Sequence, residues 1–405
     1  MSTTEIPRVP TDDETTVLPA VPPAAAPEED AEQVTETGAE TPTEKGGAHK
    51  EFRPSTAGWF GRGLVWALLA WVVLAFPVNV LSPFHVGSSD VDVASLAAIY
   101  AIGGLSLNVL LGYCGQISFG HQAFVGIGAF ASAYVVTDLG LSFWLAVAVA
   151  AGFGALQAGL LGAVSLRLTG LYFALVTLAY GTFAQETLFG ITALTGGEGG
   201  KPAPRPELFA SGYRYYFLCL GFLALVLWLD WRLTSSKAGR AMAALRENPR
   251  VASSYGINVR AYILVAFAVS GLFAGIAGSL IAHHDEVIVG SSFDFRLALL
   301  FILMTVVGGL RNRVGVVIGS AFFALLEEGA LVSMFSLGGF FEGTLGLPTE
   351  FVALVVGPIL LVLTLTLHPG GIGQQVAPVR EWLVGRRFDL HAGTTQDVEV
   401  SDVRA

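Results

Sequence analysis

Long apolar runs separated by short polar segments cover most of this 405-residue chain. Each run is about 17–25 residues long, the length that an α-helix needs to cross the hydrocarbon core of a bilayer. The pattern therefore predicts about ten membrane-spanning helices. These predicted spans lie at 63–82, 93–111, 117–137, 142–164, 171–193, 214–233, 261–282, 295–310, 314–333 and 350–367.

The composition indicates the same class of protein. Hydrophobic residues make up 53% of the chain and charged residues only 13%, and the mean hydropathy is +0.64. The 49 glycines suit helices whose backbones approach each other closely within a membrane. We expect an all-α, polytopic integral membrane protein whose transmembrane domain occupies residues 60–370.

A long charged segment between two apolar runs, Ser235–Arg260, indicates how the helices are oriented. Clustered Lys and Arg in a short loop mark the cytoplasmic side of a membrane protein. If the chain crosses ten times and this loop lies inside, both termini are cytoplasmic. The basic residues of the loop are Lys237, Arg240, Arg246, Arg250 and Arg260.

The same loop carries the start and stop signals of a short helix. Asn248 is a good N-cap, Pro249 suits the first helical position, and Gly256 suits a left-handed C-terminal cap. These residues predict a helix over 249–255. Two roles stay open for the loop: a docking site for a soluble partner, or a solvated connector.

The net charge of −10 comes mainly from the N-terminal segment. Residues 1–50 hold 11 Asp or Glu against 3 Lys or Arg, a net charge of −8 that leaves −2 for the rest. A segment this acidic and rich in Pro, Thr and Ala cannot bury a core. We therefore expect a disordered cytoplasmic tail over 1–55, and we assign 371–405 to a cytoplasmic C-terminal tail.

Ionisable side chains inside the predicted spans are candidates for function, because each is costly to place in hydrocarbon. Those we identify are His121, Glu186, Glu327 and Glu328. The alternative is that each side chain is protonated, or satisfied between helices, without contacting a substrate. For His121 the rival role is packing.

Glycines and polar residues interrupt the third apolar run. The stretch GYCGQIS, from Gly112 to Ser118, has too many of both for a regular helix interior. Irregular backbone at membrane depth is tolerated where it lines a cavity or is buried in protein. We predict a break in the helix beside His121.

Motifs for catalysis and for metal or nucleotide binding are not found. Cys114 and Cys219 have no ligand-like spacing, and HHDE at 283–286 is interpreted as an interfacial loop rather than a metal site. Lys201 follows a glycine-rich stretch but precedes Pro202, whereas a P-loop needs Ser or Thr there. The surrounding outer loop, Thr195–Tyr213, is either a connector or a docking surface. We expect neither an enzyme nor a protein that itself binds a cofactor.

Four segments occurring in a fixed order resemble one known family. They are LNVLLGYCGQISFGHQAFVGIGAF, LTGLYFALVTLAYG, the TGG at 195–197 and GRAMAALRENPRVASSYGINV. Together they are similar to the LivM-type permease of branched-chain amino acid ABC importers. The resemblance covers residues 63–370 and leaves out the N-terminal tail.

This resemblance implies a multi-pass permease subunit in the prokaryotic cell membrane, embedded in lipid, that moves branched-chain or related hydrophobic amino acids inward. It also implies a second related permease, two cytoplasmic ATPase subunits that bind the ATP, and a solute-binding protein at the outer face. No nucleic acid partner is implied. ATP hydrolysis on the separate subunits would power transport.

Two sets of site residues follow from the resemblance. Gln116, Ser118, Gly120 and His121 match the family's membrane motif; with Phe119, Glu186 and Glu327 they form the candidate substrate pathway. Glu247, Ala252 and Gly256 match the ATPase-docking motif in the coupling loop 235–260; Arg240, Arg246 and Pro249 complete that set.

Two departures from the family pattern bear on the substrate. GGLRNRVGVVIGSAF, from Gly308 to Phe322, replaces a glycine-rich turn, and Thr182 stands where an acidic residue is common, with Glu186 one turn later. A permease for urea or a short-chain amide remains an alternative. So does an ion-coupled secondary transporter, although that class is expected to carry a chain of midplane carboxylates.

Overall fold

The computed structural model describes residues 63–65, 67–68, 71, 88–168, 170–327, 362, 366 and 370–384. The chain divides into Met1–Arg53, which lies outside the described residues, and Pro54–Ala405, to which everything below refers. The predicted tail 1–55, most of the spans 63–82 and 350–367, Glu328 and the end of the C-terminal tail therefore lie outside the described residues.

Eight helices of the described part correspond to predicted spans. The span predicted over 171–193 was too long, because its α-helix ends at Phe183 and continues as a π-helix only to Leu188. The agreement is best for the runs at 142–164, 214–233 and 261–282. Among the described residues, four helical segments are long and apolar enough to cross a membrane: Asp90–Tyr113, Phe143–Ser165, Gly212–Ser235 and Val259–Asp285. The apolar helices that begin at Phe295 and Arg313 are shorter. The eight are α2 Ser88–Leu107, α3 His121–Thr137, α4 Phe143–Ser165, α5 Leu171–Phe183, α7 Gly212–Ser235, α10 Val259–Asp285, α11 Phe295–Gly308 and α12 Arg313–Glu327.

Short elements connect these helices and form caps at both ends of the bundle. A two-stranded antiparallel sheet pairs Lys201 with Ile288 and Pro202 with Val287. The short elements are the π-helices η1 Asn108–Tyr113 and η2 Ala184–Leu188, α6 Thr192–Thr195, η3 Gly197–Gly199, β1 Lys201–Pro202, η4 Glu207–Phe209, α8 Lys237–Glu247, α9 Pro249–Ser254, β2 Val287–Ile288, η5 Gly290–Phe293 and α16 Ile372–Val384.

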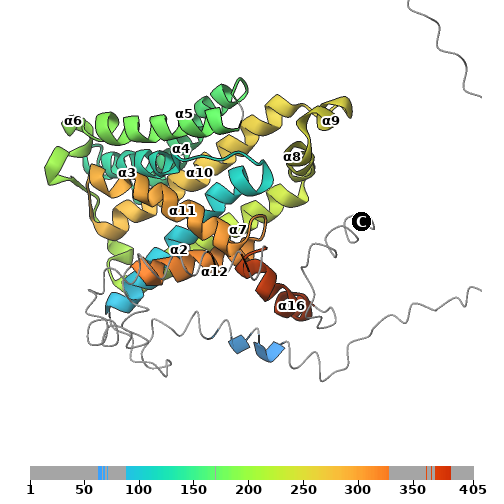
Figure 1. Cartoon of the computed structure of the whole chain (residues 1–405). Helices are drawn as coiled ribbons and strands as arrows, with labels where there is room; N and C mark the ends of the chain where they lie inside the picture. The colour runs from blue at the N-terminus through green and yellow to red at the C-terminus, as the bar shows by residue number, and fades with distance from the viewer. Residues whose placement is uncertain are drawn as a thin grey trace, which may run out of the picture. The chain divides into compact units, whose positions relative to one another are not determined.

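Helix α10 is central to the bundle and packs against α2, α3 and α4 (Figure 1). Its glycines allow backbone-to-backbone contact: a Cβ on Gly271 would overlap the carbonyl oxygen of Gly154 in α4, and one on Gly278 would overlap that of Val125 in α3. Small residues at such contacts are typical of membrane helices. The close helix packing predicted from glycine content is confirmed at these positions.

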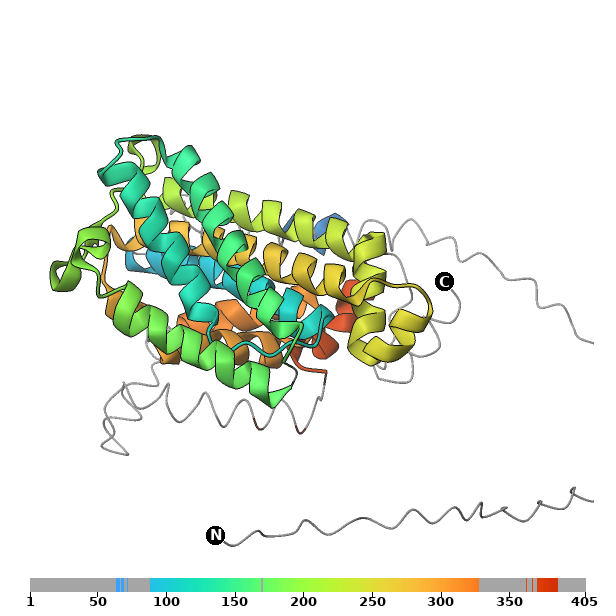
Figure 2. The same cartoon turned by 90° about the horizontal axis from the view of Figure 1, so that it is seen from above.

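The outward faces of α4, α5 and α7 are strongly apolar. Exposed large side chains include Leu160 on α4, Leu171 and Tyr172 on α5, and Trp228 and Trp231 on α7. In water, apolar surface on this scale would be unfavourable, whereas lipid or another membrane subunit can cover it. Figures 1 and 2 both place α8 and α9 at one end of the bundle and α6 at the other.

Candidate functional site

The predicted break in the helix before His121 is confirmed. Helix α2 continues into the π-helix η1, and Cys114–Gly120 is then not helical. Gly115 has φ +71°, which favours glycine, and Gln116 N donates to Leu110 O at 2.9 Å. The first end of the break is therefore anchored to η1 through backbone groups, although the segment itself has no regular structure.

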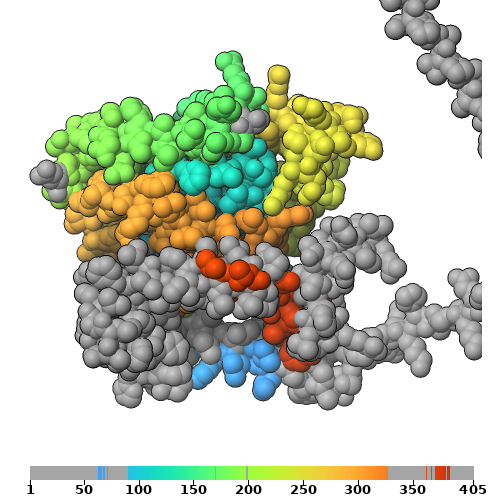
Figure 3. Space-filling model, viewed as in Figure 1, coloured from blue at the N-terminus to red at the C-terminus, as the bar shows by residue number. Residues whose placement is uncertain are grey.

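The break packs against α5 on one side. Phe119 N donates to Thr177 Oγ1 at 3.0 Å, and a Cβ on Gly120 would overlap the carbonyl oxygen of Thr177. In the space-filling view, a cyan portion of this region reaches the surface between α5 (green) and α8 and α9 (yellow) (Figure 3). Consistent with this, Gly115 and Ile117 are exposed.

His121 is fully buried at the start of α3 and joins three helices. Its Nε2 lies 2.9 Å from Ser106 Oγ, and that hydroxyl donates to Ser270 O at 2.6 Å. With the Ser106 hydroxyl hydrogen directed to Ser270 O, His121 Nε2 is the donor to Ser106 Oγ, which leaves Nδ1 as an acceptor. The ring also makes edge contacts with Phe124 and Phe301. These contacts fix the position of the ring between the helices.

Several buried polar atoms at the break have no hydrogen-bond partner among the described residues. They are Ser118 Oγ, His121 Nδ1, Gln122 Nε2 and Gln122 Oε1. An unsatisfied buried polar atom costs stability, and one found in a native structure calls for an explanation. Gln122 was not among the residues chosen from the sequence, although a lone amide in an apolar helix beside a break was a usable signal.

The structure gathers only part of the predicted substrate pathway. Ser118, Gly120 and His121 are buried at the break; Gln116 and Phe119 are half-buried there. Glu186 is exposed in η2, about 13 Å further along the helix than Thr177 at the standard rise per residue. The side chain of Glu327, the last residue of α12, lies outside the described residues.

The segment 235–260, predicted as a loop with one short helix, contains two helices. The predicted helix is confirmed as α9: Asn248 Oδ1 accepts from Arg250 N and Val251 N at 3.0 and 3.3 Å, and Gly256 has φ +78°. The loop interpretation was wrong for α8, which Ser236 caps by accepting from Ala238 N. Its buried Ala241, Met242 and Leu245 follow helical spacing, a signal that the charges obscured.

The predicted coupling residues divide into an exposed set and an inward-facing set. Arg246 Nη1 donates to the carbonyl oxygen of Gly112 in η1, and Ala252 is buried. Burial lowers the pKa of Arg246, as does the nearby charge of Arg311, while Glu247 opposes the shift. The exposed set consists of Arg240, Glu247, Pro249 and Gly256.

A buried charge pair lies near the same end of the bundle. Arg313 Nε donates to Asp230 Oδ2 at 2.8 Å, and Tyr113 OH donates to the same oxygen at 3.0 Å. Asp230 was missed in the sequence, although it is an acidic residue within an apolar run. Arg313 belongs to the segment 308–322, which departs from the family pattern. This arginine therefore has a partner in the structure, Asp230 of α7.

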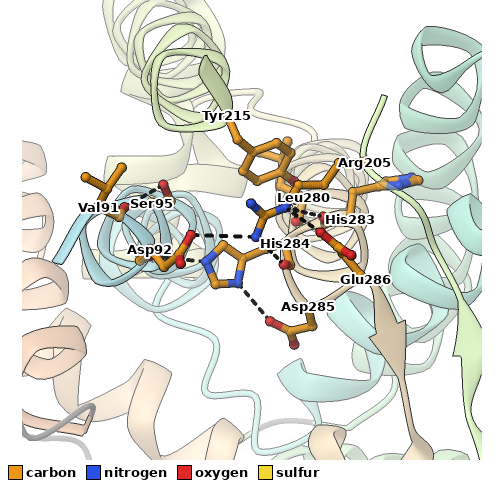
Figure 4. Close-up of polar contacts among 10 residues, drawn as sticks. All are labelled: Val91, Asp92, Ser95, Arg205, Tyr215, Leu280, His283, His284, Asp285 and Glu286. Carbon is orange, nitrogen blue, oxygen red and sulfur yellow. Dashed lines mark hydrogen bonds and ion pairs between the residues drawn. The ribbon is translucent and has the colours of Figure 1, made fainter. Parts of the chain in front are cut away.

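At the opposite end of the bundle, Arg205 joins the outer loop to two helices (Figure 4). Its Nη2 donates to His284 O at 2.8 Å, and its Nε lies 3.3 Å from Glu286 Oε1. Its guanidinium also pairs with Asp92 of α2 at 3.6 Å and lies over the ring of Tyr215. A cationic side chain at a helix C-terminus donates hydrogen bonds to carbonyl groups that have no partner within the helix. It also interacts favourably with the negative end of the helix dipole.

The interpretation of HHDE as an interfacial loop was wrong for its first three residues, which end α10. His283 is fully buried, with Nε2 3.1 Å from Ser132 Oγ and Nδ1 2.8 Å from Pro204 O. His284 pairs with Asp285 Oδ1 and with Asp92 O. A nearby ion pair, Lys201 with Asp138, lowers the pKa of that carboxyl. These groups bind one another and hold the outer loop in place.

Comparisons with known proteins agree on a family. Residues 91–364 match the family described as branched-chain amino acid transport system / permease component. The chain is 33% identical over 304 residues to the high-affinity branched-chain amino acid transport system permease protein LivM of Escherichia coli (strain K12), covering 67% of this chain and 71% of that protein.

Two further relatives show how the similarity spreads. The probable branched-chain amino acid transport permease protein LivH of Methanocaldococcus jannaschii is 31% identical over 165 residues, which are 41% of this chain and 47% of that protein. The nucleoside ABC transporter permease protein NupC of Lactococcus lactis subsp. cremoris is 27% identical over 289 residues, covering 65% and 86% of the two chains.

Proposed function

The chain belongs to the family of permease components of branched-chain amino acid transport systems, and from that membership we propose its role in detail. It is a membrane-spanning subunit of an ABC importer that moves branched-chain amino acids into a prokaryotic cell. ATP hydrolysis on separate subunits drives the transport. The chain itself binds no cofactor and catalyses no reaction.

The observation that carries this proposal is the broken helix Cys114–Gly120. This segment combines irregular backbone with two exposed residues, and it shares with the first two residues of α3 four buried polar atoms without partners in the described part of the chain. In membrane proteins such backbone is kept where it lines a pathway or is covered by protein. Ser118, His121 and Gln122 supply the groups that a polar substrate would contact.

Three surfaces fit the partners of such an importer. Thr182 of α5 and Glu186 of η2 place exposed polar groups beside the apolar face of α5, and such groups suit a contact with the second permease better than lipid. The exposed residues of α8 and α9 suit the ATPase subunits. With ten crossings, this orientation corresponds to cytoplasmic positions for both chain termini. The outer loop held by Arg205 suits a solute-binding protein.

An ion-coupled secondary transporter is the alternative of a different class. The charge of the fully buried carboxylate Asp230 is compensated by Arg313, which together with Tyr113 contacts its Oδ2, so this carboxylate has a structural partner that a cation-coupling site would not need. Within the importer class, the relative named as a nucleoside permease shows that cargo varies among similar chains. Urea and short-chain amides remain alternative cargoes.

Reconstitution of the complete importer in liposomes tests the proposal. We expect uptake of labelled leucine, isoleucine or valine that requires both internal ATP and the solute-binding protein. Uptake that needs no ATP and stops when an ionophore collapses the ion gradients would instead establish a secondary transporter. Uptake of urea or a nucleoside in preference to the amino acids would replace the cargo and keep the importer class.

The variant Gln122→Leu is expected to become more stable and to lose transport. Removing a buried amide without partners raises the free energy of unfolding by about 1 kcal/mol. If that amide contacts substrate, uptake falls although the protein is more stable. Thermal unfolding in detergent and uptake in liposomes measure the two effects.

Gln157→Leu in α4 is the matched control for this pair of measurements. Gln157 donates to Phe124 O at 3.2 Å and accepts from Tyr180 OH at 2.6 Å. Its removal is expected to lower the free energy of unfolding by about 1–3 kcal/mol. Normal uptake by the Gln122→Leu variant would remove this residue from the substrate pathway.

The variant Gly256→Val is expected to insert normally but to uncouple ATP hydrolysis from transport. A β-branched residue at φ +78° strains the end of α9 by about 1–2 kcal/mol, which shifts an equilibrium about 5- to 30-fold. A Cβ at this position meets nothing within 4 Å in this chain, so the strain acts on the backbone alone. ATPase activity, uptake and copurification of the ATPase subunits are measured together.

Gly256→Asn separates backbone strain from contact, because asparagine tolerates the left-handed conformation. We expect near-normal coupling in this variant. If both variants lose uptake equally, a side chain at 256 blocks the contact with the ATPase subunit. If both transport normally, this end of α9 has no part in coupling.

A further inference from the structure

Arg246 differs from the exposed basic residues of α8 in the direction of its side chain. Arg240 and Lys237, on the same helix, are exposed, whereas Arg246 is half-buried against the membrane helices. Its Nη1 donates to the carbonyl oxygen of Gly112. That carbonyl is in the last turn of η1, where carbonyl groups lack partners within the helix.

The stem of the same side chain covers the first residues of the break. A Cβ on Gly115 would lie 3.2 Å from Arg246 Cγ, so glycine lets the arginine lie directly against the backbone. Arg246 therefore contacts the chain on both sides of the point where η1 ends and irregular backbone begins. A single side chain of α8 holds this junction.

Groups of the membrane bundle hold the rest of η1. Asn108 Oδ1 accepts from Arg311 N at 2.9 Å at the start of the π-helix, and Tyr113 OH donates to Asp230 of α7. Gly112, in contrast, is bound by Arg246 of α8, which lies outside the membrane helices. Any displacement of α8 relative to the bundle must stretch this contact or move the junction with it.

We propose that Arg246 is a positioning residue that carries movement of α8 to the broken segment Cys114–Gly120. This inference rests on the proposed function, because it takes α8 to move when the ATPase subunits hydrolyse ATP. The half-buried guanidinium makes a charge-assisted hydrogen bond, which is stronger than a neutral one. Arg246 thus acts on the pathway through the backbone and touches no substrate.

The native Cys114 provides a direct readout, since it is buried and is the first residue of the break. In the wild-type complex with its ATPase subunits, we expect the rate of maleimide labelling at Cys114 to differ between nucleotide-free and ATP-trapped states. In Arg246→Met that difference should disappear, and amino acid transported per ATP hydrolysed should fall about tenfold or more. Peptide mass spectrometry assigns the label, with buried Cys219 as internal control.

Arg167→Met is the matched variant, because it removes an exposed cation that follows the end of α4 and lies outside α8 and α9. It should keep the nucleotide-dependent labelling of Cys114. If Arg246→Met does not assemble, Arg246→Lys, which keeps the charge but loses the planar group, is tested in the same way and should show a reduced difference.

Nucleotide-dependent labelling that persists in the Arg246 variants overturns the inference, as does wild-type labelling that nucleotide does not change. The labelling needs only ATP and the ATPase subunits, whereas the proposed function is tested by substrate uptake of the wild-type complex. Absence of ATP-dependent uptake in the wild type would reject the proposed function and leave the labelling result to decide the role of Arg246.

Discussion

Replacing Asp230 with leucine is expected to lower the free energy of unfolding by about 3 kcal/mol, because it leaves the Arg313 guanidinium without its buried partner. The two groups are 2.8 Å apart, and Tyr113 loses its acceptor as well. Asp230 is fully buried and Arg313 is partly exposed, which places the loss at the lower end of the range for buried pairs. Thermal unfolding of the purified protein in detergent measures it.

Two further variants show whether the loss comes from the unpaired charge. The double variant Asp230→Leu with Arg313→Leu should regain a large part of the stability, because it removes both charges. Glu247→Ala breaks an exposed pair with Arg311, at 4.0 Å, and should change stability by less than about 0.5 kcal/mol. If the Asp230→Leu protein is as stable as the wild type, the pair between Asp230 and Arg313 does not contribute to stability.

The variant Gly154→Leu is expected to prevent α4 from docking on α10. A Cβ at this position overlaps the carbonyl oxygen of Gly271, and a backbone group cannot turn aside as a side chain can. Overpacking of this kind costs about 1–3 kcal/mol, and separation of the two helices costs more. The expected result is loss of monodisperse protein on size-exclusion chromatography in detergent.

Gly152→Leu, in the same helix, is the control. A Cβ at Gly152 meets nothing within 4 Å, so this variant should behave normally, since leucine favours a helix over glycine by about 0.5–1 kcal/mol. Normal behaviour of both variants would mean that the contact between Gly154 and Gly271 is not needed for packing.

The spans were predictable where one signal, apolar length, decides the structure. For example, the runs at 142–164 and 214–233 correspond to Phe143–Ser165 and Gly212–Ser235. Local chemistry was sufficient for α9 too, because Asn248 caps it through backbone amides of the same helix. The full count of spans and the position of the termini relative to the membrane stay predictions.

The misses share a physical cause: they depend on partners distant in sequence. Asp230 is acceptable in an apolar run because Arg313, 83 residues later, pairs with it. His283 is buried because Ser132 and Pro204 supply its hydrogen bonds. No local pattern reveals such pairs, so Asp230 was not selected as a candidate and the end of α10 was interpreted as a loop.

The break itself lies between these cases. The sequence predicts that the helix stops, because Gly112 and Gly115 are followed by polar residues. It does not predict which residues hold the two ends of the broken segment. Thr177 and Arg246 do this from other helices. The prediction therefore located the break correctly, and it missed Gln122 and the contact between Arg246 and Gly112.

The attachment of Arg205 to both α2 and α10 has a practical consequence for placing epitope tags. The stretch around it is long and rich in glycine and proline, which ordinarily invites insertion, yet added residues there would separate β1 from β2 and Arg205 from the end of α10. Gly140 is the better position, because it lies in an exposed turn with free space around it. An epitope inserted there should remain accessible to antibody on intact spheroplasts, which would establish experimentally which end of the bundle faces outward.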